Sequence, residues 1–126
     1  MIDVLIVEPH KLPYKKSIAN DYKSMQKIVG GLIETVPLLE DNSVILICNE
    51  EGKILNLPLN RKIGYDIIAG TFIIADDDYD NGEFISLTDE QMEKYKKRFD
   101  EHSIDETYKK ILKILEKRKN KNNLEI

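Results

Sequence analysis

Apolar residues follow two different periods along this chain. In the first two thirds they gather in short β-rich runs, and in the last third they recur at helical spacing. Residues 2–8 are rich in Ile and Val and end at Pro9, which predicts a strand. Residues 44–48 are continuously apolar, as is typical of a central strand covered on both faces. The runs 33–38 and 70–75 predict two further strands.

The segments between these runs carry helix and turn signals. Residues 10–19 hold proline and three lysines and predict a loop. The Asn-Asp pair at 20–21 can cap a helix, and the tandem glycines at 30–31 would end it, because glycine accepts the left-handed conformation. The turn chemistry of residues 49–52 predicts that residues 53–55 return as a hairpin partner of the preceding strand.

Two capping boxes mark the C-terminal third. Thr88 with Gln91 precedes one apolar-periodic stretch, and Ser103 with Glu106 precedes a second. The second stretch carries a wide apolar stripe, suited to a sheet or to another helix. Its residues are Ile104, Tyr108, Ile111, Leu112, Ile114 and Leu115.

Strands followed by helices indicate an α+β fold. We expect a mostly antiparallel sheet of about four to five strands, with one helix after the first strand and two C-terminal helices. Residues 1–102 would form the core domain. Residues 103–126 would form an amphipathic helix and a frayed tail that packs on this domain, extends it, or meets a neighbouring subunit.

Composition agrees with one small cytoplasmic domain. The chain has 126 residues, of which 41% are hydrophobic and 33% charged. Asp3 and Glu8 bracket an apolar run too short for a secretory signal, and no stretch approaches the roughly 20 apolar residues of a membrane span. Cys48 is the single cysteine, which excludes an intramolecular disulfide, and its apolar neighbours predict a buried thiol.

The formal net charge of −4 hides an uneven distribution. From Ser103 onward the chain carries seven Lys and Arg against four acidic residues, so this part is +3 and the remainder is −7. The basic end could meet phosphates or an acidic partner, but a solvated helix face explains it more simply. The acidic remainder does not favour nucleic acid as a partner.

An acidic cluster at residues 76–83 is the most conspicuous polar feature. Neither of its two possible registers completes a calcium-binding loop. A solvated hairpin or strand-to-helix loop, with its turn at residues 81–82, is the simpler interpretation. If the cluster is functional, we expect it to contact a protein partner. The acidic residues of this candidate surface are Asp76, Asp77, Asp78 and Asp80.

The segment 57–66 reads as an ordered, irregular loop and is the candidate ligand site. Arg61 can make a planar bidentate contact to phosphate or carboxylate. Asn60, Lys62 and Tyr65 add hydrogen-bonding and charged groups beside it. The site would take a small anionic ligand such as a cyclic nucleotide. The alternative is that Arg61 pairs with an acid such as Asp66 and only pins the loop.

Recognised catalytic motifs are missing from the sequence. There is no Gly-x-Ser-x-Gly elbow, no phosphate-binding loop, and no glycine-rich dinucleotide fingerprint after a strand. The two histidines are far apart and one cysteine is present, which provides no clustered zinc ligands. We therefore expect no enzyme activity, no cofactor and no metal.

Several blocks of sequence resemble a family of small uncharacterised proteins with a domain of unknown function, found in phages and mobile elements of Firmicutes. The blocks are Val4–Pro9, Lys27–Gly31, Ile47–Lys53, Leu57–Arg61 and Tyr65–Phe72. The resemblance covers about residues 2 to 100, and the helix after Ser103 looks like an addition. It implies a small accessory protein and assigns no catalytic residue.

These observations favour a non-enzymatic binding protein that antagonises host defence in the host cytoplasm. The first hypothesis is sequestration of a nucleotide immune signal at residues 60–65. The alternative is a protein-interaction inhibitor that blocks a host defence protein through its acidic surface. A nucleotide-acting enzyme and a DNA-associated regulator are weaker rivals. We also expect a homo-oligomer, because Tyr108, Ile111 and Leu115 offer an apolar stripe that one small sheet does not cover.

Overall fold

The computed structural model describes residues 1–100 and 114–118, and the described part contains eight strands and two helices, with one further helical turn at residues 114–118. The strands are β1 (Ile2–Val7), β2 (Tyr14–Ile18), β3 (Ile33–Leu38), β4 (Asp41–Asn49), β5 (Leu59–Ile63), β6 (Asp66–Ala69), β7 (Phe72–Asp78) and β8 (Glu83–Ile85). The helices are α1 (Tyr22–Val29) and α2 (Asp89–Arg98).

Six strands form one antiparallel sheet. Its order is β2-β1-β7-β4-β3, and β8 pairs with the far end of β7. Strands β5 and β6 form a separate two-stranded hairpin. Strands β2 and β3 are therefore the two edges of the main sheet.

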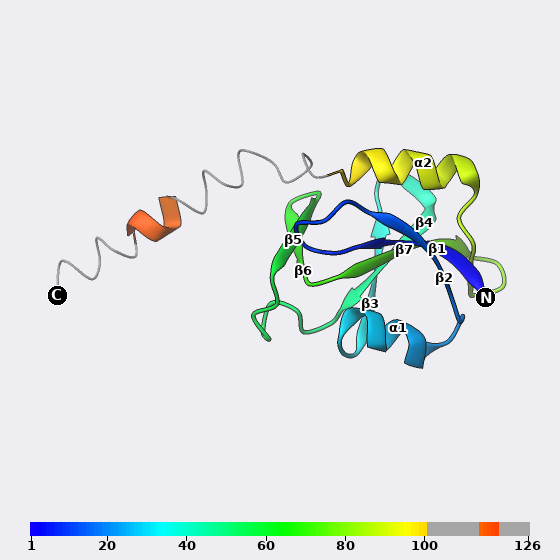
Figure 1. Cartoon of the computed structure of the whole chain (residues 1–126), viewed down its shortest axis with the longest axis horizontal. Coiled ribbons are helices and arrows are strands. Elements are labelled where there is room, and N and C mark those ends of the chain that lie inside the picture. The colour runs from blue at the N-terminus through cyan, green and yellow to red at the C-terminus, as the bar shows by residue number, and fades with distance from the viewer. Residues whose placement is uncertain (101–113, 119–126) are drawn as a thin grey trace.

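The sheet is buried on both faces, because side chains of a strand alternate between them. In β1, Leu5 and Val7 belong to one apolar cluster and Val4 and Ile6 to the other. Helix α2 and the β5–β6 hairpin cover the first face, whereas α1 covers the second (Figure 1). This two-sided burial explains why β1 and β4 read as nearly continuous apolar runs.

Local capping chemistry sets the helix ends as predicted. The Asp21 side chain accepts a 2.7 Å hydrogen bond from the Ser24 backbone at the start of α1, and Gly30 ends that helix at φ 83°. The capping box of Thr88 and Gln91 is present at the start of α2. The antiparallel sheet and the helices packed on it confirm the predicted α+β class.

The structure corrects the expected number and placement of elements. The predicted loop 10–19 contains β2, so α1 follows the second strand and not the first. Residues 53–55 lie in a series of turns and form no strand. The predicted loop 57–66 holds the β5–β6 hairpin instead. Strands β2 and β5 are polar or largely exposed, so hydrophobic alternation does not mark them, although each pairs with a strand that is its neighbour in the sequence.

The second C-terminal helix, predicted from Ser103, lies outside the described residues except for residues 114–118, which are helical and exposed. The division of the chain at residue 102 stays a prediction. In the ranges 1–100 and 114–118, no helix is long and apolar enough to cross a membrane.

Candidate functional site

Two residues of the predicted ligand loop are buried in the structure. Asn60 is 3% exposed, and its amide donates 2.8 Å hydrogen bonds to the carbonyl oxygens of Val7 and Gly70. It thereby ties β5 to the end of β1 and to the turn before β7. This side chain is satisfied by backbone and is not presented to a ligand.

Arg61 is fully buried and acts inside the fold. Its Nε and Nη2 donate to the carbonyl oxygen of Phe99, at 3.2 and 3.0 Å, at the C-terminal end of α2. Nη2 also donates to the Lys11 carbonyl at 2.7 Å, and Nη1 donates to the Asn60 Oδ1 at 2.9 Å. A cation at a helix C-terminus is favourable, because the helix dipole is negative there. Arg61 therefore joins three segments of the fold. The anion site at this residue stays a prediction, and the guanidinium donors are engaged by oxygens of the chain.

The other two predicted ligand residues do not converge with Asn60 and Arg61. Lys62 is exposed on β5, and Tyr65 is fully exposed in the turn between β5 and β6. Asp66 forms its ion pair with Lys53, whereas the hydrogen bonds of Arg61 agree with the alternative in which this residue pins the loop. No shared pocket brings the four residues together in the described part of the chain.

The acidic segment forms a hairpin turn, as the simpler interpretation predicted. Asp76, Asp77 and Asp78 lie half-buried on β7, Asp80 is exposed in the turn, and Gly82 closes it at φ 64°. Asp78 accepts a 2.8 Å hydrogen bond from the Asn81 amide and lies opposite Glu83 on β8. The segment is accessible and strongly acidic, and Gly82 and Glu83 at its end help to line a pocket of about 240 Å³ against the start of α1.

The predicted interaction stripe of the terminal helix is described only in part. Tyr108 and Ile111 lie outside the described residues. Leu115 is 53% exposed and the neighbouring Ile114 is 50% exposed. These two apolar side chains are therefore available to a partner or to a second copy.

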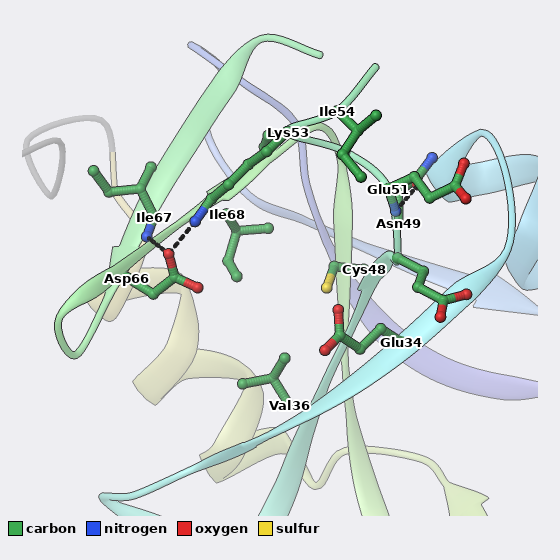
Figure 2. Close-up of a pocket in the computed structure, with 13 residues that line it drawn as sticks. Glu34, Val36, Cys48, Asn49, Glu51, Lys53, Ile54, Asp66, Ile67 and Ile68 are labelled. Atoms are coloured by element: carbon green, nitrogen blue, oxygen red, sulfur yellow. Dashed lines mark hydrogen bonds and ion pairs between the residues drawn. The ribbon is translucent and has the colours of Figure 1, made fainter. Parts of the chain in front are cut away.

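A pocket that the sequence did not predict lies between the β3–β4 edge of the sheet and the β5–β6 hairpin. Its cavity has a volume of about 170 Å³. Figure 2 shows Glu34 and Cys48 on one side and Asp66 with Lys53 on the other. We call it the Glu34 pocket. The lining residues are Glu34, Val36, Cys48, Asn49, Glu50, Glu51, Gly52, Lys53, Ile54, Asp66, Ile67, Ile68 and Ala69.

The loop after β4 shapes one wall of the Glu34 pocket. Asn49 is buried and holds the loop at its start, since its Oδ1 accepts a 2.8 Å hydrogen bond from the Glu51 backbone. Gly52 packs directly on β6, where a Cβ would lie 2.5 Å from the Ala69 carbonyl oxygen. Glycine is therefore required at this close approach. Asn56, in the left-handed region at φ 56°, ends the loop's single helical turn.

The charged groups of the Glu34 pocket differ in how they are satisfied. The Asp66 carboxylate is paired with Lys53 and accepts a 2.8 Å hydrogen bond from the Ile67 backbone. The Lys53 hydrogen bond is the main cause that holds the pKa of Asp66 below its usual value. Among the described residues, the Glu34 carboxylate has no hydrogen-bond or ion-pair partner. The Glu34 carboxylate is therefore available to an incoming group.

Cys48 forms the floor of the Glu34 pocket. It is 4% exposed, and its sulfur faces the Glu34 carboxylate (Figure 2). Burial, followed by the negative charges of Glu34 and Asp66, raises the pKa of the Cys48 thiol to about 11. The thiol therefore stays protonated at neutral pH and can donate only a weak hydrogen bond.

The Glu34 pocket suits a positively charged guest. The residues that line it include four acidic residues and one lysine, a formal net charge of −3, and Figure 2 shows the Glu51 carboxylate directed away from Asp66 and Lys53. Such a lining repels phosphates and attracts an ammonium or guanidinium group. Ile54, Ile67 and Val36 provide apolar contacts for an aliphatic stem. Within the described ranges, no group of three or more His, Cys, Asp or Glu could hold a metal ion.

Sequence reasoning missed this pocket for a physical reason. Its lining comes from β3, β4, β6 and the loop between β4 and β5, which meet only after the β5–β6 hairpin folds onto the sheet. The sequence gives one local signal, the acidic turn at residues 49–52. Glu34 looks like any exposed residue of a half-buried strand, and nothing local shows that it faces a cavity.

The comparisons with known proteins find one family. The model of a domain of unknown function (DUF3846) matches residues 2–100, so the chain belongs to this family. No curated protein and no solved structure matches the chain.

Proposed function

We propose that this DUF3846 protein is a non-enzymatic binding protein that recognises a protein partner through the Glu34 pocket. The observation that carries the proposal is a cavity whose lining residues have a formal net charge of −3 and include Glu34, a carboxylate without a partner in the described part of the chain. A lining of this kind fits a basic side chain on another protein. The accessible acidic hairpin at Asp76–Asp80 gives the surface a second region that attracts a basic partner.

The setting that we propose is a phage or mobile element whose product blocks a host defence protein in the host cytoplasm. This part of the proposal rests on the resemblance of the Val4–Pro9 and Leu57–Arg61 blocks to proteins of phages and mobile elements. Many nucleic-acid-binding proteins have basic surfaces, so an acidic protein surface can compete with nucleic acid for binding to them. Expression of the chain in a defended bacterium should then restore phage plating, and unchanged plating would contradict this setting.

A binding role agrees with the chemistry of the Glu34 pocket. A thiol with a pKa of about 11 is a poor nucleophile at neutral pH, because the thiolate is the reactive form. The Asp66 carboxylate is engaged with Lys53, so it is poorly placed to accept a substrate proton. Both groups are suited to holding a guest in place.

Sequestration of a nucleotide is the rival proposal, and its predicted donors are engaged elsewhere. Asn60 and Arg61 are buried and bind backbone carbonyls. The acidic Glu34 pocket would repel a phosphate. A panel of cyclic nucleotides tests this rival by thermal shift. A thermal shift with one nucleotide, and recovery of that nucleotide intact after heating, would favour nucleotide sequestration over binding of a protein partner.

The decisive experiment captures partners from host lysate with three forms of the tagged chain. These are the natural protein, Glu34→Lys in the pocket, and Glu90→Lys on the exposed face of α2 as a matched control. We expect a stoichiometric protein partner with the natural chain and the control, and its loss with Glu34→Lys. Equal capture by all three forms, or no stoichiometric partner, contradicts the proposal. Circular dichroism verifies that each form is folded.

A further inference from the structure

We infer that the partner adds an extended segment to the β3 edge of the sheet and places an arginine or lysine side chain in the Glu34 pocket. This inference rests on the proposed function and deepens it, because it names the part of the partner that is bound. Main-chain hydrogen bonds to the edge would give affinity, and the pocket would give specificity.

Strand β3 offers a free edge. It lies at the end of the sheet order, and in the described ranges no strand pairs with its outer side. Glu34, Thr35 and Pro37 are exposed on it. An unpaired edge presents a row of backbone donors and acceptors to an incoming strand.

The register shows which backbone groups point outward. Glu50 donates its backbone N–H to the Leu32 carbonyl at 2.8 Å. Bonded and non-bonded pairs alternate in an antiparallel ladder, so Glu34 bonds to Cys48 and the groups of Ile33 and Thr35 point to the open edge. Two donors and two acceptors are therefore available within three residues.

Pro37 limits the edge to this short stretch. It is the next outward-facing position after Thr35 and has no backbone N–H to donate. The register also shifts between Pro37 and Leu38, which disrupts the ladder there. The β3 edge therefore cannot pair with an added strand beyond Thr35, but it remains open beside the Glu34 pocket. This arrangement favours the binding of a short segment next to the pocket.

The same register directs one side chain of the added segment into the Glu34 pocket. If Ile33 and Thr35 form the bonded pairs of an antiparallel addition, the residue opposite Glu34 forms the non-bonded pair between them. Side chains of such a pair lie on the same face and approach closely. Glu34 lines the pocket and shares its face with Cys48. A basic residue at this position would meet the Glu34 carboxylate and pass its stem over the apolar wall.

The test uses a synthetic peptide and the full chain. The probe is a capped seven-residue peptide of alternating Thr and Val with a central Arg, which puts Arg and Val on one face of an extended strand. The first control peptide carries citrulline, which has the shape of Arg without its charge. The second is N-methylated at the two residues beside Arg, which removes the donors to the edge. Binding is followed by amide NMR shifts of the isotope-labelled protein.

We expect shifts at Ile33, Thr35 and Cys48 with the Arg peptide, and at least about tenfold weaker binding of both control peptides. Glu34→Gln should weaken binding to a similar degree, whereas the matched variant Glu90→Gln on α2 should not. Equal binding of the Arg and citrulline peptides, shifts confined to other surfaces, or no binding at millimolar peptide overturns the inference. If partner capture still depends on Glu34 in that case, the proposed function stands without strand addition.

Discussion

Replacing Arg61 with methionine tests whether this residue holds the fold together or serves a ligand. The side chain is fully buried, and the acceptors of its hydrogen bonds include the carbonyl oxygens of Phe99 and Lys11 and the Asn60 Oδ1. Methionine fills much of the same volume but donates none of these bonds. The end of α2, strand β5 and the segment at Lys11 would lose their common donor.

The magnitude follows from the acceptors left behind. The Phe99 carbonyl and the Asn60 Oδ1 are buried, whereas the Lys11 carbonyl is partly buried and can bind water instead. Each buried acceptor without a partner costs about 1–3 kcal/mol. We therefore expect Arg61→Met to lower the free energy of unfolding by about 2–6 kcal/mol. That is a large share of the roughly 5–15 kcal/mol that stabilises a typical domain.

Urea denaturation followed by circular dichroism measures this effect. With a denaturant slope of about 1–3 kcal/mol per molar, the midpoint should fall by about 0.7 M or more. The urea midpoint of Arg61→Lys should lie between those of the natural protein and Arg61→Met, because a lysine ammonium cannot reproduce the planar hydrogen-bonding geometry of the guanidinium. Lys16→Met on the exposed edge strand β2 is the control, with an expected change within about 0.5 kcal/mol.

A loss smaller than about 1 kcal/mol in Arg61→Met would refute the structural role of Arg61. A residue that serves a ligand typically gives the opposite result, since binding weakens while the free protein keeps its stability. Measuring the thermal shift with cyclic nucleotides in the same variant separates the two roles.

Three further predictions concern the loop, the pH dependence and the assembly. Gly52→Ala places a Cβ 2.5 Å from the Ala69 carbonyl oxygen, so it should cost about 1–3 kcal/mol in urea denaturation and shift the amide signals of the Glu34 pocket; unchanged signals would contradict the close approach. Hydrogen bonding, chiefly from the Ser43 hydroxyl, lowers the pKa of Asp41 from 3.8. The ionised Asp41 therefore contributes its full stabilisation above pH 3.8, and this contribution is lost as the pH falls through the lower folded-state pKa. Asp41→Asn should make the urea midpoint fall less steeply with decreasing pH. An equally steep fall in the variant would contradict this role of Asp41. Light scattering should give a dimer or larger oligomer for the natural chain and a smaller species for Leu115→Asp, because Leu115 is half exposed, whereas a clean natural monomer excludes self-association.

Local patterns in the sequence were sufficient for the elements that depend on neighbouring residues. A strand that is buried on both faces of a sheet is apolar at nearly every position. The Ile- and Val-rich runs of β1, β4 and β7 could therefore be recognised from the sequence alone. The ends of α1 and α2 follow from Asp21, Gly30 and Thr88, whose bonds reach only a few residues along the chain. These features could be predicted because their physical causes are local.

The tertiary structure alone decided the edge strand β2, the β5–β6 hairpin, the role of Arg61 and the Glu34 pocket. Strand β2 is mostly exposed, so only its pairing with β1 defines it. The sequence places Arg61 among polar residues and leaves a ligand contact and a structural role open, whereas the structure shows that its acceptors include carbonyls at positions 11 and 99, far apart along the chain. A buried cation must be paired or hydrogen-bonded, and for Arg61 the partners include carbonyls from these distant positions. A pocket exists only where separate segments meet without filling the space between them. Both depend on long-range packing, which hydrophobic periodicity does not encode.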